Sequence, residues 1–138
     1  MKNIKQYYKE LGKLVYAVAA ADGAIQVEER DKLHQFVLTE MANHEETTDS
    51  SGMNQAFYVD FEFDAAEEKH LTSNEIIMSY VKFVQSNYES SDGLLINNSL
   101  KLLEAVASAY SKKNEKNVID IVRMEIKEIS KNILRTTK

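Results

Sequence analysis

An acidic turn early in the chain has the spacing of half a calcium-binding loop. The pattern D-G-x-I-x-x-x-E is formed by Asp22, Gly23, Ile25 and Glu29. In an EF-hand loop the glycine makes the sharp turn and the final glutamate binds the cation through both carboxylate oxygens. Asp22 and Glu29 are therefore candidate ligands for a hard divalent cation, which prefers oxygen donors.

The first half of such a loop is missing, so a cation here would need oxygen ligands from elsewhere in the fold. Val18 and Ala20 stand where an EF-hand loop has aspartates. The nearest reserve of carboxylates is DFEFDAAEE, residues 60–68, from which Asp60 or Asp64 could complete the site.

The alternative interpretation of the same residues is purely structural. Asp22 and Gly23 would form a turn between two helices, and Glu28 and Glu29 would sit in the first turn of the second helix. Acids are favourable there because they complement the helix dipole.

Long helices must position these carboxylates, because the chain has no proline and only four glycines in 138 residues. Apolar residues recur at helical spacing over residues 4–21, and Gly23 stops that helix. A second helix is expected over residues 26–46.

Three further helices are expected in the second half of the chain, over residues 73–88, 93–112 and 114–135. Thr72 and Glu75 have the spacing of a capping box for the first of them. We therefore predict one all-α domain over residues 1–138, a bundle of five to seven helices. A faint repeat between residues 17–33 and 105–121 indicates two related helical hairpins, with chance similarity between helices as the alternative.

The segment before residue 73 has a different pattern. Residues 58–64 alternate between apolar and acidic side chains, which is typical of a strand. No second convincing strand exists to pair with it, and a lone strand would leave its backbone hydrogen bonds unmet. We therefore expect an extended or short helical connector that buries Phe57, Phe61 and Phe63 and leads into a helical turn at residues 64–70.

Charge is concentrated in the middle of the chain. Residues 22–75 carry fourteen acidic and three basic residues, whereas both ends are basic and the whole chain has a net charge of −5. Overall acidity argues against nucleic acid as a partner. The acidic stretch could instead dock a basic protein partner.

Several classes of site are excluded by residue types and spacing. The chain has no cysteine, and its three histidines form no H-E-x-x-H pattern. No P-loop, G-x-S-x-G or G-x-G-x-x-G motif occurs. We therefore predict no catalytic residue, and no cofactor other than a divalent cation. No secretory signal and no apolar run of about 20 residues is present, so we expect a cytoplasmic protein without a transmembrane segment.

The string YAVAAADGAIQVEERDKL resembles the tellurite-resistance TerB-like family, with the clear match covering residues 14–33. The resemblance implies a small bacterial all-helical domain with an acidic site for a divalent cation, calcium rather than magnesium. It also implies stress or tellurite-resistance systems that act near the membrane with partner proteins. Carried over by position, the candidate ligands are Asp22 and Glu29, with Glu28 as their neighbour. The second acidic turn that the family pattern implies is absent, since Tyr110 and Ser111 stand there.

The leading prediction is a non-enzymatic, TerB-like module that binds a divalent cation and acts through protein partners, including a membrane-associated complex. The first alternative is a metal-free helical interaction module that uses the acidic surface of residues 22–75. The second alternative is a metal-dependent hydrolase, in which a bound cation would activate water. That alternative requires a concave pocket beside the carboxylates.

Overall fold

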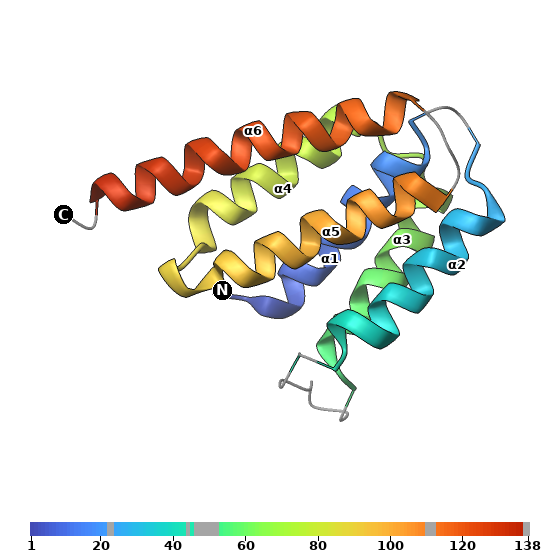
Figure 1. Cartoon of the computed structure of the whole chain (residues 1–138), viewed down its shortest axis with the longest axis horizontal. Helices are drawn as coiled ribbons and strands as arrows, with labels where there is room; N and C mark the ends of the chain where they lie inside the picture. The colour runs from blue at the N-terminus through green and yellow to red at the C-terminus, as the bar shows by residue number, and fades with distance from the viewer. Residues whose placement is uncertain (22–23, 44, 46–52, 110–112, 137–138) are drawn as a thin grey trace.

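Helices account for every regular element that the structure describes, so the predicted all-α class is confirmed (Figure 1). The structure is a computed structural model, and it describes residues 1–21, 24–43, 45, 53–109 and 113–136, with side chains within the last range only for residues 117–128. The six helices in these ranges are α1 (Ile4–Ala19), α2 (Val27–Phe36), α3 (Tyr58–Lys69), α4 (Ser73–Asn87), α5 (Gly93–Ala109) and α6 (Lys113–Thr136). A π-helical turn, Val37–Met41, continues α2. None of the described helices is long and apolar enough to cross a membrane.

The first helix lies at the centre of the fold. Eleven of the sixteen residues of α1 are buried, so the helix is covered on most of its sides. Its neighbours are α3, α4, α5 and α6. Such complete burial needs apolar or small side chains around most of the helix, and the run from Leu11 to Ala19 supplies them.

The segment over residues 57–70 differs from our expectation. It is neither extended nor a short helical connector, because residues 58–69 form one regular helix, α3. Val59, Phe63 and Ala66 are buried at helical spacing, so the alternation of residues 58–64 concealed a core stripe of period 3.6. Our prediction that Phe61 is buried is wrong, since 51% of this residue is exposed.

The helix expected over residues 26–46 is shorter in the structure. Its α-helical part is α2, and the π-helical turn that follows ends at Met41. The helices expected over residues 73–88, 93–112 and 114–135 correspond to α4, α5 and α6. The capping box of α4 is present: the backbone N–H of Glu75 donates to Thr72 Oγ1 at 3.3 Å.

The predicted pair of related hairpins is only partly visible in the packing. Helices α5 and α6 lie against each other, as a hairpin requires. Helix α2 instead makes its main contacts with α5, and α1 makes its closest contacts with α3. Helices α1 and α2 therefore do not pack as a closed hairpin, because α2 packs mainly on α5.

A glycine permits the close contact between α1 and α3. A Cβ atom built on Gly12 would collide with the backbone carbonyl oxygen of Val59 and lie 2.9 Å from Cβ of Glu62. Any larger residue would push α3 outward. Gly12 therefore sets the distance between the two helices.

Buried hydroxyl groups join α1 to α4 and α5. The hydroxyl of Tyr7 lies 2.9 Å from that of Tyr80 and 2.6 Å from Oγ of Ser99. Ser99 also donates to the backbone carbonyl of Leu95 at 2.8 Å. Each of these three hydroxyl groups thus has a hydrogen-bond partner, which offsets the cost of burying it. Burial raises the pKa of Tyr7 to about 12, so the network stays neutral.

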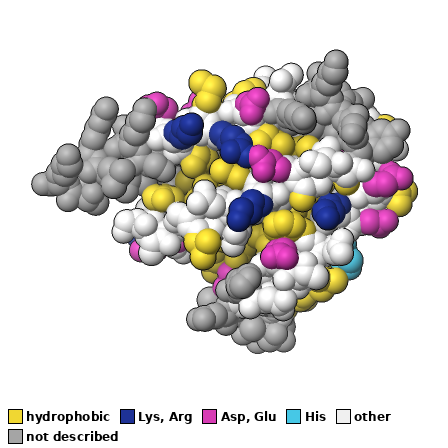
Figure 2. Space-filling model, in the orientation of Figure 1, with side chains coloured by type: hydrophobic (Ala, Val, Ile, Leu, Met, Phe, Trp, Pro, Cys, Tyr) yellow, Lys and Arg dark blue, Asp and Glu magenta, His cyan; other side chains and the backbone are white. Residues whose placement is uncertain are grey.

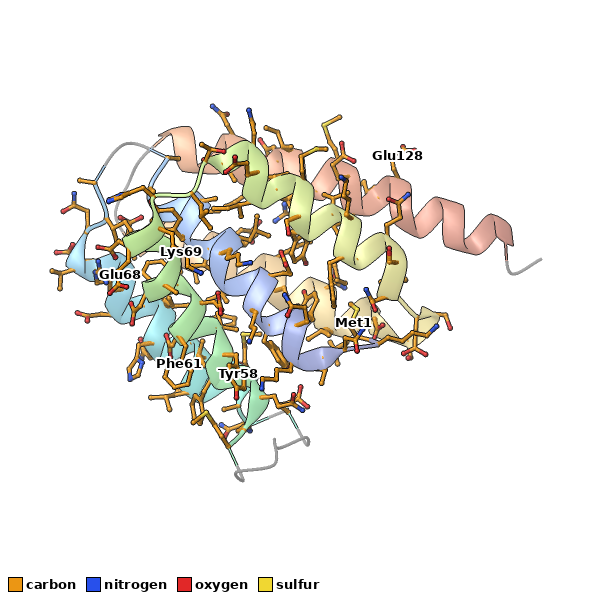
Figure 3. All side chains as sticks on the ribbon, turned by 180° about the vertical axis from the view of Figure 1, so that it is seen from behind. Met1, Tyr58, Phe61, Glu68, Lys69 and Glu128 are labelled. Atoms are coloured by element: carbon orange, nitrogen blue, oxygen red, sulfur yellow. The ribbon has the colours of Figure 1, made fainter. Side chains whose placement is uncertain are left out.

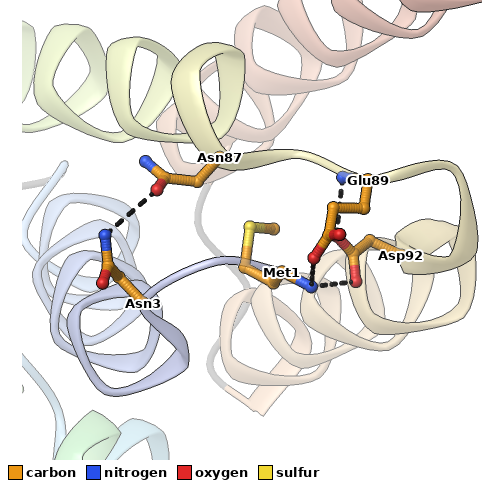
Figure 4. Close-up of polar contacts among 5 residues, drawn as sticks. All are labelled: Met1, Asn3, Asn87, Glu89 and Asp92. Carbon is orange, nitrogen blue, oxygen red and sulfur yellow. Dashed lines mark hydrogen bonds and ion pairs between the residues drawn. The ribbon is translucent and has the colours of Figure 1, made fainter.

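The amino group of Met1 is fixed between two carboxylates that precede α5 (Figure 4). It lies 2.6 Å from Oδ1 of Asp92 and 3.0 Å from Oε1 of Glu89. Burial by itself would lower the pKa of this ammonium. The hydrogen bonds to Asp92 and Glu89 outweigh burial and raise the pKa above its ordinary value of 8.0.

We predict that Gly12→Ala destabilises the protein by up to about 2 kcal/mol in urea unfolding. Alanine gains about 1 kcal/mol of helix propensity. The collision with the backbone of α3 costs more, because overpacking a tight site typically costs about 1–3 kcal/mol and a backbone carbonyl cannot rotate away. The matched control is Gly93→Ala, whose Cβ would meet only the Tyr88 hydroxyl at 4.0 Å. Equal stability of the two variants would contradict the close contact.

We predict that the chain beginning with a free amino group at Met1 loses stability above pH 8.0. The folded pKa is raised, so the contribution of the ammonium is fully present below the unfolded value of 8.0. It is lost as the pH rises through the folded pKa. Urea midpoints measured from about pH 7 to about pH 10 should fall less for Asp92→Asn than for the wild type. Identical falls would show that Asp92 does not hold the ammonium.

Candidate functional site

A groove of about 450 Å³ runs between α2 and α3. Its lining comes from α2, from α3 and from the turn before α3, namely Arg30, Asp31, Leu33, His34, Phe57, Asp60, Phe61, Phe63 and Asp64. A second hollow shares Arg30 and Asp64 with it and extends past Glu67 and Glu68 to His70. We call the two together the α2–α3 groove.

The floor of the groove is apolar. Leu33 and Phe63 are almost completely buried there, at 2% and 1% exposure. The guanidinium of Arg30 lies over the ring of Phe63, 5.7 Å from its centroid. Phe61 lies at the edge of the groove and is about half exposed to solvent. Its ring packs edge-on against that of Tyr58, with 5.9 Å between the ring centroids. Figure 3 shows Tyr58 and Phe61 toward one end of α3, and Glu68 and Lys69 toward the other.

Two sets of polar contacts join α2 to α3 across the groove. Arg30 reaches across to Asp64, with 3.6 Å between Nη1 and Oδ1, and also pairs with Glu67. One helical turn further along, Nδ1 of His34 lies 3.2 Å from Oδ2 of Asp60. Arg30 and His34 are four residues apart on α2, and their partners on α3 are also four residues apart. The two pairs of side chains therefore meet in register across the groove.

Asp60 is the most enclosed carboxylate of the groove. Its side chain is 19% exposed, whereas that of its partner His34 is 67% exposed. Burial raises the pKa of the Asp60 carboxyl above its ordinary value, and the neighbouring Asp64 adds to this. The hydrogen bond from His34 opposes the shift without cancelling it. A cation placed beside Asp60 would therefore interact with it more strongly than with a fully hydrated carboxylate.

The structure places the predicted ligand Glu29 in the core. It is 0% exposed, and its Oε1 accepts a hydrogen bond from the backbone N–H of Gln26 at 2.9 Å. Glu29 thus closes the first turn of α2, and Glu28 lies exposed beside it in the same turn. The interpretation of these two acids as first-turn residues of a helix is confirmed. Asp22 lies outside the described residues, so its distance from Glu29 is not part of this structure.

The other two predicted ligands, Asp60 and Asp64, lie together on α3 but face basic side chains of α2. Across the described parts of the chain, no three His, Asp or Glu side chains come together as a metal would require. The concave pocket that the hydrolase alternative requires is present beside Asp60 and Asp64.

Sequence reasoning placed Glu67 in the reserve of carboxylates over residues 60–68 but missed Arg30 and His34 as members of the site. A usable signal was present, because Arg30 and His34 are four residues apart and Asp60, Asp64 and Glu67 recur at helical spacing. Two facing helices with those stripes would pair by charge. The signal becomes visible only when residues 58–69 are recognised as a helix.

The face of the molecule to which α2, α5 and α6 contribute has a mixed charge pattern. Figure 2 shows Lys and Arg side chains over the middle of that face, with Asp and Glu among them and apolar side chains between. Mixed charges give no strong field of one sign.

Comparison of the chain with protein-family models, with curated proteins and with solved structures finds no match. The function must therefore be inferred from the geometry of the site and from the residues themselves.

Proposed function

We propose that this chain is a non-enzymatic helical module that binds a protein partner in the α2–α3 groove. The observation that carries the proposal is the combination of an apolar floor, an exposed aromatic lip and a rim rich in carboxylates in one continuous hollow. Protein-binding surfaces often have an apolar centre with aromatic side chains and a polar rim.

Phe61 is the strongest single indication. A lone exposed hydrophobic residue is ordinary on a protein surface. Phe61 is different because it borders a groove whose floor is formed by Leu33 and Phe63, so a partner side chain that covers Phe61 can also enter the groove. Aromatic residues at the edge of such a strip are frequent sources of binding energy.

The second candidate function is a TerB-like module that binds a divalent cation, calcium rather than magnesium, at Asp22 and Glu29. Its favouring observation is the position of Glu29 in the first turn of α2, at the end of the D-G-x-I-x-x-x-E spacing that begins at Asp22. Under this proposal Glu28 stays at the edge of the site, and Asp60 and Asp64 are not ligands. The TerB-like resemblance would then place the protein in stress or tellurite resistance in the bacterial cytoplasm, working with partners in a membrane-associated complex.

The groove proposal predicts which proteins the chain retains after cross-linking in its source cells. Wild type and the Phe61→Ala variant are tagged, together with Met78→Ala as the matched control, since Met78 is 57% exposed on α4. Partners should be enriched by wild type and by Met78→Ala. They should be depleted for Phe61→Ala, because loss of a binding hot spot costs about 2 kcal/mol. Equal recovery by all three proteins would contradict a binding role for the groove.

The cation proposal predicts heat when calcium is titrated into metal-stripped protein, and a higher melting temperature with calcium present. At 100 times its dissociation constant, a ligand that binds only the folded chain adds about 2.7 kcal/mol of stability. The Asp22→Asn variant should lose both effects while its unfolding without calcium stays close to wild type. The control is Asp64→Asn, which should keep both. Equal calcium affinity for wild type and Asp22→Asn would remove the cation site.

A further inference from the structure

The charge of the α2–α3 groove limits the chemistry of what can enter it. Five carboxylates border the two connected hollows: Asp31, Asp60, Asp64, Glu67 and Glu68. Arg30 is the only Lys or Arg among the lining residues of these hollows, and it is already paired with Asp64 and Glu67. A partner that brings acidic residues would be repelled, whereas one that brings Lys or Arg would be attracted.

Not all of this negative charge is neutralised within the chain. Asp31 and Glu68 are exposed and make no ion pair with any other described residue. Among the described residues, the Asp60 carboxylate pairs with the imidazole of His34 and with no Lys or Arg side chain. Cationic side chains of a partner would therefore find Asp60 near the start of α3, Glu68 near its end and Asp31 on α2 without a Lys or Arg partner among the described residues.

The shape of the groove favours a helical occupant. The groove lies between two helices and is bordered by α3, whose twelve residues span about 18 Å. An extended peptide usually binds by adding a strand to a sheet edge, and the described elements of this fold include no sheet. A helix satisfies its own backbone hydrogen bonds and presents apolar anchors at i, i+3, i+4 and i+7. Three helical turns match the length of α3.

We propose that the α2–α3 groove binds a basic amphipathic helix of a partner protein, whose apolar face covers Phe61 and enters the groove, and whose Lys or Arg side chains pair with Asp60 and Asp64. This inference rests on the proposed function of the groove and adds the class of its partner. The incoming cation at Asp60 replaces the imidazole of His34, which is exposed and free to swing away. The incoming apolar side chain covers the ring of Phe61.

The test uses two synthetic peptides of about 16 residues, long enough to span α3 with a turn to spare. Both have leucines at i, i+3, i+4 and i+7. One has lysines at the flanking positions and the other has glutamates at the same positions. Each is titrated into the full chain by fluorescence anisotropy at low and at physiological salt. The lysine peptide should bind at least about ten-fold more tightly than the glutamate peptide, and salt should weaken its binding.

Variants of the full chain localise the binding. Phe61→Ala and the double variant Asp60→Asn/Asp64→Asn should each weaken the lysine peptide at least about ten-fold, the loss expected for a hot spot. The matched controls, Met78→Ala on α4 and Asp120→Asn on α6, should leave its affinity unchanged. Thermal melts establish that each variant is folded. If the double variant does not fold, Asp60→Asn and Asp64→Asn are tested singly, and each should weaken the lysine peptide.

Two results would overturn the proposal. The first is equal binding, or absence of binding, for the lysine and glutamate peptides. The second is tight binding of the lysine peptide that Phe61→Ala and Asp60→Asn/Asp64→Asn do not change, because it would place the peptide elsewhere on the acidic surface. Partner capture in cells separates the two proposals. If capture depends on Phe61 while the peptide test fails, the groove binds a partner of another class. If both fail, the groove is not a binding site.

Discussion

The close contact between α1 and α3 at Gly12 decides where the groove lies. Because Gly12 has no side chain, the backbone of α3 rests directly on α1, and Val59 and Phe63 are driven into the core. Each residue of a helix is turned by about 100° from the one before it. Once Val59 and Phe63 face α1, the next residues, Asp60 and Asp64, must point about 100° away from α1. They face α2, where Arg30 and His34 receive them.

Hydrophobic periodicity predicted most of the fold because most helices here have one buried face and one wet face. The period of 3.6 is then visible directly in the positions of the apolar residues, as in α4. Residues 58–64 defeated this reasoning for a physical reason. Phe61 is apolar but exposed, so it added an apolar residue on the wrong face and converted a helical stripe into an apparent alternation. The residue that misled the prediction is also the one that marks the groove.

The candidate site was harder to predict than the fold because its contacts join residues far apart in sequence. Glu29 follows the rule for an acidic residue in the first turn of a helix, because its carboxylate accepts a hydrogen bond from the backbone N–H of Gln26. The pairing of His34 with Asp60 and of Arg30 with Asp64 depends instead on the packing of α2 against α5 and of α3 against α1. No spacing along one helix carries that information. Composition alone located the acidic excess in residues 22–75 without showing that an apolar floor lies under it.

The groove can exchange its own ion pairs for those of a partner because these pairs are not what holds α2 in place. The side chains of Asp64 and His34 are about two-thirds exposed and that of Arg30 is 40% exposed, and exposed ion pairs contribute only about 0–1 kcal/mol each. The position of α2 is set by buried Leu33 and Val37, and by the packing of α2 on α5. Burial of a side chain such as Leu contributes about 1.5–3 kcal/mol. A cation arriving at Asp60 therefore competes with a weak contact, while the helix that carries the groove stays anchored from the opposite side.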